Sequence, residues 1–154
     1  QSAFPVWYAQ LSRHKQKPEI IKTTDKQIVE NIVKEIAASF SGAESTKHWK
    51  NDTIWFDAAP YASVGVKNAK KVFDEAFGNL QSCDVEILDM RTFVNGNSAL
   101  VCSVQKWDTV NKDGSANPSF MMRQTDYFEK QNGEWKLLHE HTSMADGWDG
   151  TIME

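Results

Sequence analysis

The 154 residues fit one domain, and 40% hydrophobic with 25% charged residues is the composition of an ordinary globular protein. A formal net charge of −4 argues against nucleic acid or an anionic membrane surface as the main partner. No apolar run approaches the roughly 20 residues that a membrane-spanning helix needs. Cys83 and Cys102 form neither a disulfide framework nor a metal motif, and we expect both to be free thiols.

The first 23 residues have no clear periodicity, so we predict an N-terminal arm for this segment. Four apolar side chains could dock the arm onto the domain: Phe4, Val6, Trp7 and Tyr8. The chain begins at Gln1 and not at a methionine. This start is compatible with a trimmed signal peptide and equally with a chosen boundary.

Two helices are predicted in the first half of the chain. Residues 24–27 have the pattern of a capping box, and the apolar positions from Ile28 to Phe40 then follow one helical stripe. Ser41-Gly42 is expected to end this helix. A second amphipathic segment predicts a helix over 67–77 that stops at Gly78.

Between the helices lies a short apolar run, Thr53 to Asp57, followed directly by the turn sequence Ala58-Ala59-Pro60. Asp57 therefore stands at a strand end, where a carboxylate has two roles open to it. It can cap the turn by accepting backbone N–H groups. It can instead face an apolar pocket, where its pKa would rise toward the value that a general base needs.

From residue 84 onward the hydrophobic period becomes two, which predicts strands over 84–94, 98–109, 119–130 and 134–143. Asn95-Gly96 and Asn132-Gly133 are tight-turn sequences, and a polar loop fills 111–118. Helices followed by a strand meander indicate an α+β fold, in which a curved antiparallel sheet wraps over the helices.

Several motifs in this order resemble the SnoaL-like and ketosteroid isomerase group of the nuclear transport factor 2-like superfamily. They comprise residues 51–57, then Gly65 with Ala69 and Phe73, then 123–126 and 133–143. The last segment is also similar to the association domain of calcium/calmodulin-dependent kinase II. The resemblance covers roughly residues 24–144 and leaves 145–154 as a C-terminal tail. It implies a cone-shaped, cystatin-like fold with a pocket inside the cone.

The resemblance also implies roles for two aspartates. Ketosteroid isomerases use a strand-end aspartate as general base, and Asp57 matches that position. A protonated aspartate near the position of Asp126 helps to form their oxyanion hole; that enzyme is the standard example of a carboxylic acid kept neutral by an apolar site. An ion pair of Asp126 with Arg123 at the sheet edge is the structural alternative. The helix tyrosine of those isomerases has no counterpart between Ile28 and Phe40.

The register of the last hairpin decides which side chains accompany Asp126. With a three-residue loop over 131–133, Asp126 would stand opposite Leu138. One face would then hold Met122, Gln124, Asp126 and Phe128 with Leu138, Glu140 and Thr142. The other face would hold Arg123, Thr125 and Tyr127 with Leu137, His139 and His141. A two-residue loop would reverse the faces of one strand.

These patterns predict a protein that binds a small, largely apolar molecule and uses no cofactor. The leading hypothesis is an enzyme of isomerase, cyclase or dehydratase type, with Asp57 as base and Asp126 as acid or second carboxylate. The expected lining consists of Trp55, Tyr61, Met122, Gln124, Glu140 and Thr142. The alternative is a non-catalytic ligand-binding or assembly domain.

Two further expectations concern the outer sheet face. His139 and His141 share a strand face, but no third metal ligand is evident, so we expect no metal site. Tyr127, Trp135 and Leu137 would accompany the histidines on that face. Because so much exposed apolar area is unusual for a monomer, we expect a homodimer packed through it.

Overall fold

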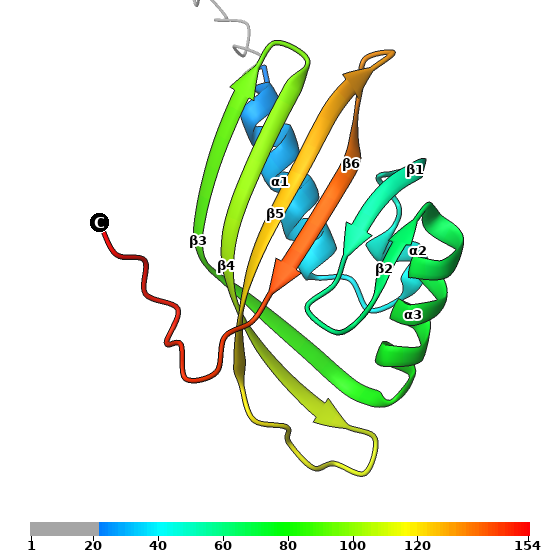
Figure 1. Ribbon diagram of the computed structural model, residues 1–154, viewed down its shortest axis with the longest axis vertical. Coiled ribbons are helices and arrows are strands. Elements are labelled where there is room, and N and C mark those ends of the chain that lie inside the picture. Colours follow the sequence, from blue (N-terminus) through cyan, green and yellow to red (C-terminus); the bar gives the residue numbers. More distant parts are fainter. Residues whose placement is uncertain (1–21) are drawn as a thin grey trace, which may run out of the picture.

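The structure, a computed structural model, describes residues 22–154 (Figure 1). The predicted anchors Phe4, Val6, Trp7 and Tyr8 lie outside the described residues. Three helices are present: α1 (Asp25–Ala37), α2 (Gly42–Ser45) and α3 (Val66–Gly78). Six strands follow the sequence as β1 (Trp49–Phe56), β2 (Ala62–Val64), β3 (Leu80–Asn95), β4 (Ser98–Asn111), β5 (Phe120–Gln131) and β6 (Glu134–Ser143). Within 22–154, no helix is long and apolar enough to cross a membrane.

The six strands form one curved, open sheet in the order β2-β1-β6-β5-β4-β3. The predicted α+β fold, with a sheet wrapped over N-terminal helices, is confirmed. One correction applies to strand direction: β1 pairs with β6 in parallel, whereas the other neighbours are antiparallel. This parallel pair brings two predicted site residues together, because Trp55 of β1 lies beside Glu140 of β6.

Helix α1 begins with the predicted capping box, in which Thr24 and Gln27 exchange hydrogen bonds. Its apolar stripe packs on the concave face of the sheet, and the core there contains Val29, Val33 and Phe128, all fully buried. The first helix ends earlier than predicted, at Ala37. Ser41 then caps the short helix α2 instead of stopping α1.

The β5–β6 hairpin corrects the predicted register. Its loop has two residues, Asn132 and Gly133, both with positive φ, so Gln131 pairs with Glu134. A β-bulge then adds Leu138, with Phe128 opposite Leu137 but Tyr127 opposite His139. After the bulge, each β5 residue pairs one position further along β6 than it would in a regular hairpin. Asp126 therefore stands opposite Glu140 and not opposite Leu138.

The bulge also divides β6 into two phases. Before the bulge, Trp135 and Leu137 point into the core and are almost fully buried, contrary to their predicted place on the outer face. Beyond it, Glu140 and Thr142 are buried while His141 is exposed, as the predicted face assignment required. The predicted inward position of Leu138 was wrong, because Leu138 is the inserted residue of the bulge.

After β6 the C-terminal segment, residues 144–154, crosses the lower part of the sheet and runs out past β3 (Figure 1). Gly150 approaches Leu88, Val104 and Met121 so closely that an added Cβ would lie 3.1 Å from the Leu88 Cδ1 atom. At the end of the chain, Arg91 pairs with Glu154 at 3.3 Å. These contacts hold the segment against the side of the sheet that faces away from α1.

Candidate functional site

Two adjacent spaces lie between α3 and the lower half of the sheet. The larger, which we call the outer pocket, measures about 760 Å³. The smaller, which we call the inner cavity, measures about 50 Å³ and extends toward the end of α1. Both spaces share lining residues, namely Asp57, Phe73, Phe77, Trp107 and Met122. The site therefore has a broad entrance and a narrow inner end.

The outer pocket is mostly apolar, which is the usual character of a small-molecule site. Helix α3 contributes Val72, Phe73, Ala76 and Phe77, which the sequence predicted as a helix face but not as a pocket wall. Strands β4 and β5 add the stacked pair of Trp107 and Phe120, with ring centroids 5.8 Å apart, and two methionines.

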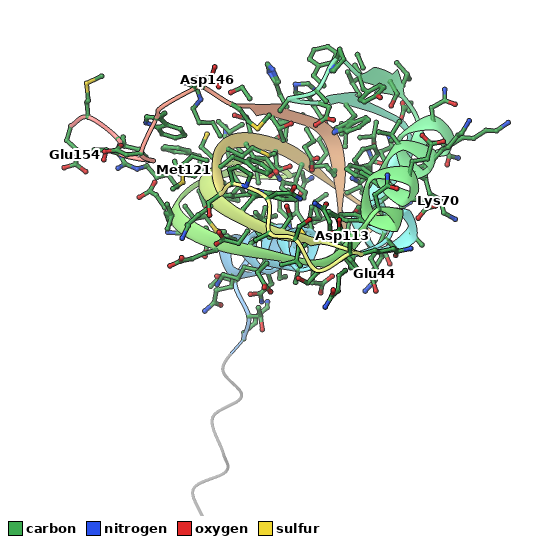
Figure 2. The ribbon with its side chains drawn as sticks, turned by 90° about the horizontal axis from the view of Figure 1, so that it is seen from below. Glu44, Lys70, Asp113, Met121, Asp146 and Glu154 are labelled. Atoms are coloured by element: carbon green, nitrogen blue, oxygen red, sulfur yellow. The ribbon has the colours of Figure 1, made fainter. Side chains whose placement is uncertain are left out.

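The C-terminal segment completes the outer pocket. Residues 144–148 line it, and Trp148 is held by the Arg123 guanidinium 5.3 Å from its ring centroid. Figure 2 shows Asp146 on this segment, near the part of the sheet that carries Met121. Only the long sheet-crossing path of the segment brings it to the pocket. Local sequence patterns carry no signal for this path, and the tail was expected to lie outside the domain.

Asp57 stands at the junction of the two spaces and fulfils both of the roles considered for it. Its Oδ1 atom accepts the Ala58 N–H at 2.7 Å and the Thr142 hydroxyl at 3.2 Å, so it does cap the turn. Its carboxyl also lines both the outer pocket and the inner cavity. Partial burial raises the pKa of Asp57, and the bonds from Ala58 and Thr142 oppose this rise.

Behind Asp57 lies a pair of carboxyl groups, Asp126 and Glu140, on facing positions of β5 and β6. Gln124 links them through its Nε2 amide, which is 2.9 Å from Asp126 Oδ2 and 3.5 Å from Glu140 Oε2. Asp126 is 0% exposed, and its Oδ1 atom has no hydrogen-bond partner among the described residues. Within residues 22–154, no ion pair links Asp126 to Arg123. Arg123 is instead exposed, on the other side of the strand.

The environment of this pair favours its protonated forms. Burial raises the pKa of Asp126 to about 6, while the bond from Gln124 opposes the rise. Burial also raises the pKa of Glu140 well above its usual range, and the neighbouring charges of Asp126 and Asp57 raise it further. Two carboxyls that interact this closely titrate as a unit, so their pKa values belong to the pair and not to either residue alone.

The other predicted site residues fall into two groups. Trp55, Met122, Gln124, Glu140 and Thr142 all line the inner cavity, with Trp55 packed against Phe73 at a centroid distance of 4.8 Å. Tyr61 does not belong to the site: it is 51% exposed and lines neither space. Its backbone carbonyl accepts the Asp57 N–H, so it serves the turn and not the pocket.

Asp57, directly after β1, and the two buried carboxyls of β5 and β6 thus lie close together, while α1 contributes little to the walls. Only Ile36 and Ala37, at its end, reach the inner cavity. The sequence analysis also missed Gln105, which lines the cavity and accepts the Trp107 indole N–H at 3.1 Å. Its place between Ser103 and Trp107 on the inward side of the predicted strand could have indicated it.

His139 and His141 lie on the opposite side of β6 from Glu140. Both rings pack edge-on against Phe56, and His139 Nδ1 is 3.0 Å from the Ile54 carbonyl oxygen. Among residues 22–154, no group of three His, Cys, Asp or Glu side chains could hold a metal ion. Cys83 and Cys102 are both unpaired and half-buried.

The sequence and the structure were compared with known proteins to identify the family of this chain. No curated protein matches the sequence significantly. Among solved structures, a nuclear transport factor 2-like protein from Salmonella enterica serovar Typhimurium has a TM-score of 0.69 at 16% identity, covering 83% of this chain and 96% of its own. A protein from Novosphingobium aromaticivorans, provisionally assigned as an aromatic ring hydroxylase, has a TM-score of 0.70 at 15% identity, with 78% and 88% covered.

A protein from Parabacteroides distasonis, provisionally assigned as a ketosteroid isomerase, has a TM-score of 0.63 at 14% identity, covering 80% of this chain and 90% of its own. At such identities these likenesses establish the nuclear transport factor 2-like fold, while fold alone leaves the chemistry open. The model of the SnoaL-like domain matches residues 27–147, which include every element from α1 to β6. The chain therefore belongs to the SnoaL-like domain family.

Proposed function

We propose that this protein binds a small, largely apolar carbonyl compound in the outer pocket and acts on it by acid–base chemistry of the isomerase, cyclase or dehydratase type, without a cofactor. Asp57 would be the general base, and the Asp126–Glu140 pair would supply the acid. The reacting carbon would lie where the apolar outer pocket meets the polar inner cavity. The apolar remainder of the molecule would contact α3, Trp107 and Phe120.

One observation carries this proposal: Asp57 lies between a wide apolar pocket and a carboxyl pair whose pKa values are raised by burial. A base and an acid are then available on either side of one small space. Elevated pKa values in a concave, mostly apolar site are typical of catalytic carboxyls. The non-catalytic alternative draws its support from the two hydrogen bonds that Asp57 already accepts in the turn.

Hydrogen–deuterium exchange tests the proposal without knowledge of the natural substrate. Cyclic ketones such as 2-tetralone and 1-indanone would be incubated with the protein in D₂O, and deuterium at the carbon next to the carbonyl would be followed by proton NMR. We expect the protein to accelerate exchange in at least one of these ketones. Asp57→Asn should reduce that acceleration by about 100-fold or more, the usual contribution of a general base.

Asp52→Asn is the matched control, because Asp52 lies on β1, just before Asp57, but is 75% exposed and among residues 22–154 pairs only with Lys50. It should exchange at the wild-type rate. Undiminished exchange in Asp57→Asn would contradict the assignment of the base. Ketone binding without any exchange above buffer would contradict the enzyme and favour the ligand-binding alternative.

We also propose that the protein forms a homodimer through the outer face of β1 and β6. The apolar residues exposed there differ from those predicted, because Trp135 and Leu137 are buried. Ile54, Phe56 and Val64 are instead 42%, 43% and 68% exposed, next to the two histidines.

Sedimentation should give a dimer that Phe56→Asp dissociates, while Phe93→Asp on the distant β3 strand should leave it intact. A wild-type monomer of 17.5 kDa at every concentration would contradict this proposal.

A further inference from the structure

Two carboxyl groups line the inner cavity and a third lies next to it, and none of the described residues that line it is a cation. Asp57 and Glu140 line it, Asp126 lies directly behind Glu140, and the remaining lining side chains are neutral. From β4 the groups facing this space are Gln105 and Trp107, and from the end of α1 and from α2 they are Ser39 and Ser45. Three buried negative charges without a counter-charge would be prohibitively unfavourable, so at least one carboxyl must be protonated.

The two members of the buried pair differ in what they can reach. Glu140 has its carboxyl among the lining of the inner cavity, together with Asp57 and Thr142. Asp126 is enclosed behind it, is fully buried, and lines neither space. Asp126 receives the shorter bond from the Gln124 amide, at 2.9 Å against 3.5 Å for Glu140. Gln124 thus favours the ionised form of Asp126 over that of Glu140. Burial and the charges of Asp126 and Asp57 raise the pKa of Glu140 more than the Trp55 side chain lowers it.

We infer that Glu140 carries the proton of the pair and presents it to the inner cavity as the acid of the proposed reaction, whereas Asp126 is a positioning residue that keeps Glu140 protonated. This inference rests on the proposed function for the role of acid. The location of the proton, however, is a property of the ligand-free protein. It differs from the assignment made from the family resemblance, which gave the acid role to Asp126.

The proposed proton transfers balance without an oxidant or reductant. Asp57 takes the proton from the carbon next to the carbonyl, and the C–H electron pair forms a carbon–carbon double bond. Glu140 gives its proton to the carbonyl oxygen, which produces an enol and leaves Glu140 ionised. In the second half, Asp57 returns its proton to a different carbon of the conjugated system. The enol proton then returns to Glu140, so both carboxyls end as they began.

Carboxyl carbon-13 NMR of the ligand-free protein tests where the proton lies. Labelling glutamate Cδ in one sample and aspartate Cγ in another separates Glu140 from Asp126 without any substitution. We expect one glutamate carbon to remain protonated at neutral pH, where exposed glutamates are ionised. Glu140→Gln should remove this signal, while Glu134→Gln, an exposed control on the same strand, should leave it.

The role of Asp126 has its own readout. In Asp126→Asn the glutamate signal should titrate at a pH lower by about one unit, since strongly interacting carboxyls shift each other by at least that much. A protonated aspartate carbon at neutral pH, with every glutamate ionised, would overturn the inference. So would a Glu140 titration that is unmoved in a folded Asp126→Asn variant. Neither result depends on ketone exchange, so the failure of this inference is distinguishable from the failure of the proposed function.

Discussion

The two ends of the cone use the same strands for opposite purposes. At the upper end, under α1, the inward positions of β4, β5 and β6 are Val101, Phe128 and Leu137, each 0% exposed. At the lower end, under α3, inward positions of the same strands are Gln105, Gln124 and Glu140, which are just as buried. The change from apolar to polar takes place within a few residues of each strand.

This contrast separates stability from chemistry along one sheet. The upper end buries apolar surface, which stabilises the fold. The lower end buries amides and carboxyls that gain little from being there and must be hydrogen-bonded or protonated instead. Buried polar groups that lower the stability of the folded state are characteristic of functional sites, where this loss is tolerated.

The largest expected effect is at the upper end. Phe128→Ala should lower the free energy of unfolding by about 3–5 kcal/mol, because a large side chain is removed from a fully buried position. Chemical denaturation would measure this loss. Phe93→Ala is the control on the same sheet, and since Phe93 is largely exposed its effect should be within about 0.5 kcal/mol. Equal losses in the two variants would contradict the placement of the core.

The second effect belongs to the lower end and depends on pH. Because the pKa values of Asp126 and Glu140 are raised in the folded state, the folded protein binds more protons than the unfolded chain above about pH 4. The stability contributed by this pair should therefore be greatest below the ordinary carboxyl pKa and should decline as the pH rises through about 6 and beyond.

Denaturant titrations between pH 4 and pH 8 would measure this slope. Asp126→Asn should flatten it, because one of the two raised carboxyls is gone and Glu140 loses a charged neighbour. Phe93→Ala, which touches no titrating group in the site, should keep the wild-type slope. A slope that is the same in the wild type and in a folded Asp126→Asn variant would contradict the raised pKa values of this pair.

A smaller effect is expected at the start of α1. Thr24→Ala removes the hydroxyl that accepts the Gln27 N–H at 3.2 Å and should cost about 1 kcal/mol, the usual worth of an N-cap. Thr24→Ser keeps the acceptor and should be close to wild type. If the alanine and serine variants unfold at the same denaturant concentration, the capping box contributes nothing measurable.

The smallest expected effect on stability lies on the C-terminal segment. Trp148→Ala removes the contact with Arg123 and should cost about 0.5–1 kcal/mol, as is typical of an exposed cation–π pair. The same change removes part of the outer pocket and should weaken ketone binding by much more than Thr24→Ala does. Comparing the two variants by titration calorimetry separates a pocket wall from a stabilising contact.

The sequence predicted the elements of this fold better than it predicted their partners. The capping box at Thr24 and the strand over 134–143 are local patterns, and both are present as expected. The parallel pairing of β1 with β6 joins residues about 85 positions apart, and no local pattern encodes it. Asp57 and Glu140 come together through this pairing. Asp126 and Glu140 stand opposite each other because of the bulge at Leu138, which the hairpin sequence did not predict.

The walls of the outer pocket escaped prediction for a related reason. Phe73 and Phe77 lie on an amphipathic helix whose apolar side packs somewhere in any fold, and periodicity alone does not distinguish a core from a pocket. Trp148 lies beyond the last strand, where a tail was expected. The α3 wall and the position of Trp148 both depend on tertiary contacts between segments that are distant in the sequence.

The bulge residue Leu138 affects how the sequences of homologues should be aligned with this chain. Strict alternation from Trp135 and Leu137 would carry His139 and His141 to the inside and give the cavity an imidazole pair instead of a carboxyl. A homologue with a regular strand and one residue fewer would keep its carboxyl inside, and an ungapped alignment would wrongly equate that carboxyl with a histidine. Deleting Leu138 from this chain should therefore straighten the strand and leave Glu140 facing Asp126.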